Sequence, residues 1–354
     1  MPADQVKLFS FKVWTYRMGE QVSFTIHLGD LLGLYRAMAG QGPLSSAALA
    51  SSLGFDERFV REWLYGQAAA GLVEFRSADE HVFELTDVQA AVLADEEHSI
   101  AFAAGAFSGG PQRAVIDAIA ESFRTGVGLT YEQQGPATAA AMGRMTGPWS
   151  RQALISTILP SLDGVVERLE QGIDVLDIGC GAGLTLCLIA QAFPNSRCVG
   201  YDPSESAVRL ARSRAKDLGL TNIDFVVAMA DDVPPDPRFD LVLTFDCLHD
   251  MPRPDLAAAS IGAAMSADAT WLIKDIRSSG SFETDRRNPL LALFYGFSIE
   301  TCLQSALSEP GGLGLGTLGL HAERLEELTT AAGFPSLRVH DFDDAANLYY
   351  EVRR

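Results

Sequence analysis

The stretch VLDIGCGAGLTLCLIAQAF, residues 175–193, joins a short apolar run to a glycine-rich turn and an apolar segment of helical length. Its turn holds Gly179, Gly181 and Gly183, and Asp177 stands two residues before the first of these glycines. A strand, a glycine turn and a helix in this order are typical of the nucleotide-binding end of an α/β sheet. The stretch therefore predicts an α/β domain with a ligand at this turn.

The spacing of the glycines argues against a dinucleotide. Leu184 occupies the place of the third glycine in the GxGxxG fingerprint, whereas Asp202, 19 residues after Gly183, can accept hydrogen bonds from a ribose diol. A literal GxGxxG occurs at residues 314–319, but it follows LSEPGG and has no acid about 20 residues beyond it. We expect residues 314–319 to form a loop before a helix that begins at His321.

Apolar runs alternate with amphipathic segments from residue 173 onward, as in a parallel, doubly wound sheet. The expected strands are 173–178, 197–201, 223–227, 239–245 and 270–275, followed by two more within 336–354. The expected helices between them are 184–193, 204–218 and 254–265.

The N-terminal part has the signals of a winged helix. Ser45 and Asp56 are placed to cap two short helices, Gly54 closes the first of these, and residues 72–87 alternate around a polar turn like a hairpin. We expect a winged-helix domain over residues 1–100, a helical connector over 101–150 and a ligand-binding α/β domain over 151–354.

Three segments carry a family resemblance. VLDIGCGAG (175–183), GYDPS (200–204) and FVVAMADDVPPDPRFDLVLTFDCLHDM (225–251) resemble the class I S-adenosylmethionine-dependent methyltransferases. Residues 288–303 and 314–334 are similar to a bacterial branch of the small-molecule O-methyltransferases, which often carry a winged-helix dimerisation domain in front. The resemblance implies a Rossmann-like, seven-stranded methyltransferase sheet preceded by a mostly α winged-helix domain.

The resemblance also implies S-adenosylmethionine as the cofactor. Asp177 is then expected to hold its ammonium group, directly or through water, and Asp202 its ribose hydroxyls. Met229 stands where the family usually has an acid, so that either Asp231 contacts the adenine or backbone groups and Met229 hold it. The expected cofactor residues are Asp177, Gly179, Cys180, Gly181, Gly183, Asp202, Met229, Ala230, Asp231 and Phe245.

The pair His249-Asp250 follows the expected strand 239–245. Plant-type O-methyltransferases have an HD pair in this place, and by that resemblance His249 is the candidate general base. Alternatively, His249 caps the next helix or packs against the cofactor, and we expect Asp250 to be the N-cap of that helix. The candidate pocket residues for the methyl acceptor are Tyr131, Trp149, Asp246, Phe294 and Tyr295. If these aromatic side chains line a pocket rather than a core, the acceptor is largely apolar.

Charge and cysteine usage narrow the choice of partners. The formal charge is −19, from 27 basic and 46 acidic side chains, and a field of this sign repels nucleic acids and anionic membranes. Residues 45–87 contain three arginines against eight acids, so we expect the winged helix to support a homodimer rather than to bind DNA.

The five cysteines have no metal-ligand spacing, so we expect no metal site. No signal-peptide core or membrane-length apolar run is evident, and the scattered cysteines fit a reducing compartment. These features predict a cytoplasmic chain.

Together these features predict a methyltransferase that acts on a small, largely apolar molecule, with oxygen as the expected methyl acceptor. N- or C-methylation on the same scaffold is an alternative, because the cofactor half would look the same. Two further alternatives are a transcriptional regulator that senses S-adenosylmethionine and, against the glycine spacing, a nicotinamide oxidoreductase. The sequence leaves the identity of the acceptor open.

Overall fold

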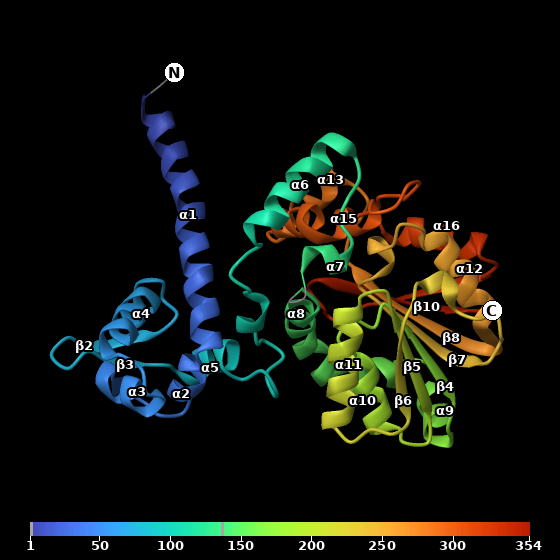
Figure 1. The fold of residues 1–354 in the computed structure, drawn as a ribbon, viewed down its shortest axis with the longest axis horizontal. Coiled ribbons are helices and arrows are strands. Elements are labelled where there is room, and N and C mark those ends of the chain that lie inside the picture. Colours follow the sequence, from blue (N-terminus) through green and yellow to red (C-terminus); the bar gives the residue numbers. More distant parts are fainter. Residues whose placement is uncertain (1–2, 136–137) are drawn as a thin grey trace. The chain divides into compact units, whose positions relative to one another are not determined.

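The computed structural model describes residues 3–135 and 138–354, which fold into two compact units (Figure 1). The first unit comprises residues 1–111 and 144–152, and the second comprises 112–143 and 153–354. The expected connector, residues 101–150, is thus divided between the two units. Its contribution to a substrate pocket stays a prediction.

The first unit has the expected winged-helix elements. The Ser45 hydroxyl accepts a hydrogen bond from the backbone N–H of Ala48, the Asp56 carboxylate caps the next helix, and Gly54 ends the first in a left-handed conformation. Short strands pair in the order β1-β3-β2 and form the wing. The elements of this unit are α1 (Ala3–Leu31), α2 (Leu34–Met38), β1 (Leu44–Ser45), α3 (Ser46–Leu53), α4 (Glu57–Ala69), β2 (Glu74–Ser77), β3 (Val82–Glu84), α5 (Asp87–Leu93) and η1 (Ala104–Ala106).

A partly buried ion-pair network joins residues 144–152 to the rest of the first unit. Arg144 lies 2.5 Å from an Asp30 carboxylate oxygen and 2.5 Å from a Glu96 oxygen. Burial alone would raise the pKa of Asp30, but hydrogen bonds and attraction from Arg144 and Arg36 lower it. These bonds explain why the C-terminal half of α8 (Thr138–Ala153) belongs to the first unit.

A seven-stranded sheet forms the centre of the second unit, in the order β6-β5-β4-β7-β8-β10-β9. The strands from β6 to β8 are parallel, and β10 is antiparallel to both β8 and β9. Their bounds are β4 (Asp174–Ile178), β5 (Arg197–Asp202), β6 (Ile223–Val227), β7 (Phe239–Phe245), β8 (Met265–Ile276), β9 (Ser336–His340) and β10 (Asn347–Arg353). The expected strands are confirmed, but β8 begins earlier than expected, because Met265 already pairs with Phe239 of β7, before an irregularity in the pairing that precedes Thr270.

Helices cover both faces of the sheet, with α10 and α11 on one side and α12 and α16 on the other (Figure 1). Leu176 and Trp271 of the strands share a buried cluster with Ile261 of α12 and Leu325 of α16. Side chains alternate along a strand, so the equally buried Leu243 lies on the opposite face. The helices are α9 (Val165–Gln171), α10 (Leu184–Ala192), α11 (Glu205–Asp217), α12 (Pro254–Ala264) and α16 (Ala322–Ala331).

Shorter helical segments complete this unit. They are α6 (Arg113–Thr125), α7 (Tyr131–Gln134), η2 (Leu154–Ile158), η3 (Leu159–Ser161), η4 (Ala230–Asp232), η5 (Leu248–Asp250), α13 (Phe282–Asp285), α14 (Leu291–Phe297), η6 (Ser298–Cys302) and α15 (Leu303–Ala306). Among the described residues, none of the helices has both the length and the apolar character that a membrane span requires.

The glycine turn after β4 is tightly packed at Gly179 and open at Gly181. The backbone N–H groups of Gly179 and Cys180 donate to the Tyr201 carbonyl, which ties the turn to β5. Gly179 has φ +70°, and a Cβ there would lie 2.6 Å from the Cβ of Cys247. Gly181 also has a positive φ, +53°, but no atom lies within 4 Å of the place of its Cβ. Sterically, Gly179 is required by the fold, whereas Gly181 leaves room for a ligand.

We therefore predict different costs for alanine at the two positions. Gly181→Ala should cost about 1–2 kcal/mol, the strain of a left-handed alanine. Gly179→Ala should cost roughly 1–3 kcal/mol more because the new methyl group overlaps Cys247. Urea denaturation of both variants measures the difference, and equal losses of stability would contradict this account of the turn.

Candidate active site

The candidate site lies at the edge where the parallel strands of the sheet end. Asp177 is near the end of β4, Asp202 ends β5, and Asp275 is the next-to-last residue of β8. His249 and Asp250 follow β7 in η5. Because β5, β4, β7 and β8 are neighbours and parallel, their carboxyl ends meet at one edge, which is where open α/β sheets bind ligands.

Backbone groups fix the orientation of the Asp202 carboxylate. Its Oδ2 accepts a hydrogen bond from the N–H of Gly181 at 2.9 Å, and its Oδ1 accepts one from the N–H of Ser204 at 2.9 Å. Burial raises the pKa of Asp202, although both of these hydrogen bonds oppose the rise. Each oxygen keeps a further lone pair, so the carboxylate can still accept hydrogen bonds from a ligand.

Asp177 is a buried acid without a cationic side chain beside it. It is 2% exposed, and within residues 3–135 and 138–354 no lysine, arginine or histidine forms an ion pair with it. Burial, together with the negative charge of Asp202, raises its pKa well above the usual range. A ligand that brings a positive group to this place would stabilise the ionised carboxylate.

Two carboxylates flank the imidazole of His249. Nδ1 lies 2.7 Å from Asp275 Oδ1 in a hydrogen bond, and Nε2 lies 3.1 Å from Asp250 Oδ1 without regular hydrogen-bond geometry. Burial of this 2%-exposed residue lowers its pKa, but the two carboxylates outweigh burial and raise the pKa well above the ordinary value. Asp275 thus sets the ring orientation, and Nε2 points toward the Asp250 carboxylate.

The expectation that Asp250 caps the following helix is wrong. Helix α12 has Arg253 as its N-cap, and Pro254 in its first turn lacks one of the N–H groups that a cap would satisfy. Asp250 Oδ2 instead accepts a hydrogen bond from the Tyr131 hydroxyl at 2.5 Å. His249 does not cap α12 either, because it lies within η5 and bonds Asp275.

The short helix α7 contacts two of these strand ends. Besides the bond from Tyr131 to Asp250, Glu132 Oε2 accepts hydrogen bonds from the hydroxyls of Ser204 at 2.7 Å and Ser206 at 2.8 Å. These bonds lower the pKa of Glu132. Adjacent residues of α7 therefore contact the start of α11, directly after Asp202, and the segment after β7 that carries His249.

Two further predicted site residues, Asp246 and Phe245, lie at the same edge and contact other side chains of the domain. Asp246, just after β7, has a strained φ of +52°, and its carboxylate accepts hydrogen bonds from buried Lys274 at 2.6 Å and from Asn347. The Phe245 ring packs edge-on against Tyr349, with centroids 6.2 Å apart. A pocket role for Asp246 and a cofactor contact for Phe245 stay predictions.

The loop after β6 holds Met229, Ala230 and Asp231. Asp232 Oδ2 accepts a hydrogen bond from the N–H of Met229 at 3.0 Å, whereas Asp231 is exposed. Met229 and Ala230 are half-buried. Cys180 is buried in the glycine turn, and burial raises the pKa of its thiol well above the usual value.

The predicted acceptor-pocket aromatics are spread over both units. Phe294 is buried in α14, and Tyr295 beside it is exposed, with its ring 6.2 Å from that of Phe282. Tyr131 belongs to the second unit and Trp149 to the first. Their common role around one acceptor stays a prediction.

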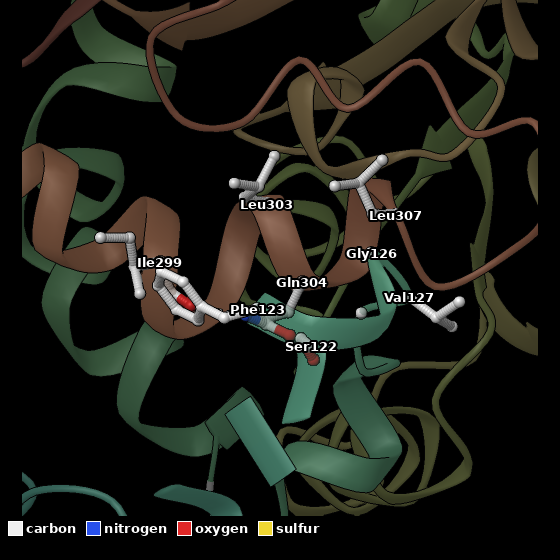
Figure 2. A pocket seen from close by; sticks show the side chains of 9 residues that line it. Ser122, Phe123, Gly126, Val127, Ile299, Leu303, Gln304 and Leu307 are labelled. Atoms are coloured by element: carbon white, nitrogen blue, oxygen red, sulfur yellow. Dashed lines mark hydrogen bonds between the residues drawn. The ribbon is translucent and has the colours of Figure 1, made fainter. Parts of the chain in front are cut away.

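Figure 2 shows an apolar groove between α6, the loop after it and the segment η6–α15. Phe123 and Val127 face Ile299, Leu303 and Leu307 across the groove. No titratable side chain lines it, and none of the predicted site residues is among its walls. The groove therefore lacks groups for acid–base chemistry.

The second glycine cluster forms a loop, as expected. Residues 307–321 contain no strand, and α16 begins after its N-cap His321. A Cβ at Gly316 would lie 2.6 Å from Ser298 Oγ and one at Gly314 2.8 Å from Leu307, so these glycines serve local packing.

Comparison with known sequences identifies both units. Residues 169–295 match the family described as a methyltransferase domain, and residues 20–95 match the Rv2258c-like winged HTH domain. A 2-heptyl-1-hydroxyquinolin-4(1H)-one methyltransferase of Mycobacteroides abscessus is 32% identical over 124 residues, which are 35% of this chain and 50% of that protein. A probable (S)-tetrahydroprotoberberine N-methyltransferase 2 of Papaver bracteatum is 28% identical over 106 residues, 30% of each chain. The matched stretches thus span about a third to a half of these relatives.

Solved structures resemble the whole chain. Human N-acetylserotonin methyltransferase in complex with S-adenosylmethionine aligns over 97% of both chains, with a TM-score of 0.65 and 18% identity. An O-methyltransferase family protein from Burkholderia thailandensis aligns over 100% of this chain and 98% of that one, with a TM-score of 0.64 and 18% identity. The chain therefore has a class I methyltransferase fold behind a winged-helix domain.

Proposed function

We propose that this chain, which carries a methyltransferase domain behind a winged-helix domain, transfers a methyl group from S-adenosylmethionine to an oxygen atom of a small, largely apolar molecule. The observation that carries the proposal is the buried His249–Asp275 pair, which turns Nε2 toward the Asp250 carboxylate at the sheet edge that also holds the glycine turn. Its five cysteines are free and buried, which supports a cytoplasmic location.

The residues around the glycine turn fit this cofactor. The open space beside Gly181 admits an amino-acid chain close to the backbone, and Asp202 offers two oriented oxygens to a ribose diol. The cofactor carries an ammonium group, which would supply the positive charge that Asp177 lacks within the described residues. When bound, S-adenosylmethionine supplies a methyl group on a sulfonium centre.

The chain's own contribution to the reaction is to position the acceptor and move its proton. Asp275 holds His249 so that Nε2 can accept the proton of an acceptor hydroxyl. The negative charges of Asp275 and Asp250 stabilise the imidazolium that this proton transfer forms. Alignment of the acceptor oxygen with the methyl group supplies much of the remaining rate.

N- or C-methylation is the main alternative, and one of the relatives above is itself called an N-methyltransferase. The proposed role of His249 as a base favours an acceptor that must lose a proton, as a hydroxyl does. A DNA-binding regulator is less consistent with the winged helix. Each arginine between residues 45 and 87 pairs with a glutamate: Arg58 with Glu62, Arg61 with Glu57 and Arg76 with Glu84.

A homodimer is part of the proposal because of α1. Phe9, Phe11, Trp14 and Tyr16 on this helix are each about two-thirds exposed, which is unusual for aromatic side chains in an isolated domain. Burial of these rings against a second copy would remove a large apolar area from water.

Asp202→Asn should weaken the binding of S-adenosylhomocysteine about 10- to 100-fold, because the hydrogen bonds from the ribose lose a charged acceptor. Asp217→Asn, on an exposed position at the end of α11, is the matched control and should bind normally. Isothermal titration calorimetry measures both. Tight binding of NAD without any response to S-adenosylhomocysteine would refute the proposed cofactor.

His249→Ala should lower kcat by roughly 10²–10⁴ while the affinity for S-adenosylhomocysteine stays unchanged. The acceptor is first found by screening phenols and hydroxy acids with labelled S-adenosylmethionine. His98→Ala removes an exposed histidine and serves as the control. Unchanged turnover in His249→Ala would remove the base from the mechanism.

Trp14→Glu combined with Phe11→Glu should convert the dimer into a monomer, because two charges would be buried at the contact. Lys12→Glu, a charge change on the same helix, should leave the dimer intact. Size-exclusion chromatography with light scattering measures the mass of each, and a monomeric wild-type chain would show that the proposed dimer is wrong.

A further inference from the structure

Three side chains with metal-binding atoms converge in the active-site region. His249 Nε2, Asp250 Oδ1 and Cys302 Sγ all lie within 4.8 Å of one another, and all three residues are buried. Nε2 and Oδ1 are 3.1 Å apart. Cys302 ends η6, 53 residues after His249 in the chain, so the fold and not a local motif brings the thiol to the imidazole.

Neighbouring side chains contact all three residues, and His249 and Asp250 are held at the atom that is not part of the cluster. Asp275 binds Nδ1 of His249 at 2.7 Å, and the Tyr131 hydroxyl binds Oδ2 of Asp250 at 2.5 Å. The Thr301 hydroxyl lies 3.5 Å from Cys302 Sγ. Metal sites in proteins characteristically have such outer hydrogen bonds, which orient the ligands and set the tautomer of a histidine.

The Asp250 carboxylate keeps one oxygen available for a cation. Asp250 is 7% exposed, and its Oδ1 contacts His249 Nε2 at 3.1 Å as an ion pair but accepts no regular hydrogen bond within the described part of the chain. A cation bound between Oδ1 and Nε2 would use the lone pairs that this buried oxygen leaves without a hydrogen bond.

We propose that His249, Asp250 and Cys302 form a binding site for a zinc-type divalent cation. Imidazole, thiolate and carboxylate are ligands that Zn²⁺ accepts together, whereas Mg²⁺ and Ca²⁺ require oxygen ligands. Zinc bonds of about 2.0–2.3 Å place tetrahedral ligand atoms roughly 3.3–3.8 Å apart. The separations in this cluster, from 3.1 Å to at most 4.8 Å, need only small side-chain rotations to match.

Binding has a defined proton balance and a consequence for catalysis. The Cys302 thiol loses its proton to solvent, a proton carried by His249 Nε2 leaves in the same way, and His249 then binds through the Nε2 lone pair as neutral imidazole. That lone pair is the one that accepts the acceptor's proton in the proposed function, and this consequence rests on that function. Zinc at this site therefore inhibits methyl transfer, and the fourth coordination position is left to water.

Cobalt(II) is the probe for binding, because a thiolate ligand gives Co²⁺ an intense charge-transfer absorption. One equivalent of Co²⁺ should produce this band in the wild-type chain, and Zn²⁺ should abolish it by displacement. Cys302→Ala should lose the band, whereas Cys187→Ala, which removes another buried thiol from α10, should keep it. Absence of the band in the wild type, or its persistence in Cys302→Ala, would overturn the site.

A second test uses only the wild-type chain, so its result does not depend on whether the variants fold. Cadmium-113 NMR of the protein loaded with one equivalent of Cd²⁺ should give a single resonance in the range of sites with one sulfur ligand. A resonance typical of oxygen ligands alone would refute the site without any substitution.

Activity provides a separate readout. Zn²⁺ should lower the turnover of the wild-type chain at least tenfold, and Cys302→Ala should need at least tenfold more Zn²⁺ for the same inhibition. Inhibition that is equal in both would contradict the inference. Activation by Zn²⁺ would refute His249 as the free base of the proposed function, while the cobalt and cadmium results would still decide the site.

Discussion

Compensation of negative charge is the constraint on which the ligand-binding edge of the sheet depends. Asp177, Asp202, Asp250 and Asp275 are gathered where parallel strands end, in surroundings that raise the pKa of the first, second and last of them. His249 forms ion pairs with Asp250 and Asp275. Within the described residues, no cationic side chain forms an ion pair with Asp177. This edge therefore favours ligands that carry positive charge, such as a sulfonium or ammonium group.

The short helix α7 links this charge pattern to the shape of the site. Tyr131 holds the carboxylate that faces His249, and its neighbour Glu132 holds the serines beside Asp202. The two loops thus share one support, although they follow different strands. Displacement of α7 would remove contacts beside His249 and beside Asp202 together, so the proposed proton transfer and the proposed cofactor contact share one structural support.

Local sequence patterns predicted the elements because strands and helices depend mainly on nearby residues. The strand 239–245, the cap at Ser45 and the position of the glycine turn after β4 are of this kind. Contacts between distant segments had no such signal. The bond of Asp275 to His249 and that of Tyr131 to Asp250 join residues 26 and 119 positions apart. The predicted cap at Asp250 was wrong for the same reason: a long-range bond from Tyr131 engages that carboxylate.

The proposed proton transfer and the proposed cation binding both use the same atom, His249 Nε2. The proposed base, His249 Nε2, has an orienting carboxylate on Nδ1, a second carboxylate nearby and a position buried away from water. The same features describe a good metal ligand, and Cys302 adds the thiol that distinguishes zinc from magnesium. At this edge, a zinc-type cation and the methyl acceptor would therefore compete for Nε2, and a bound acceptor would exclude the cation.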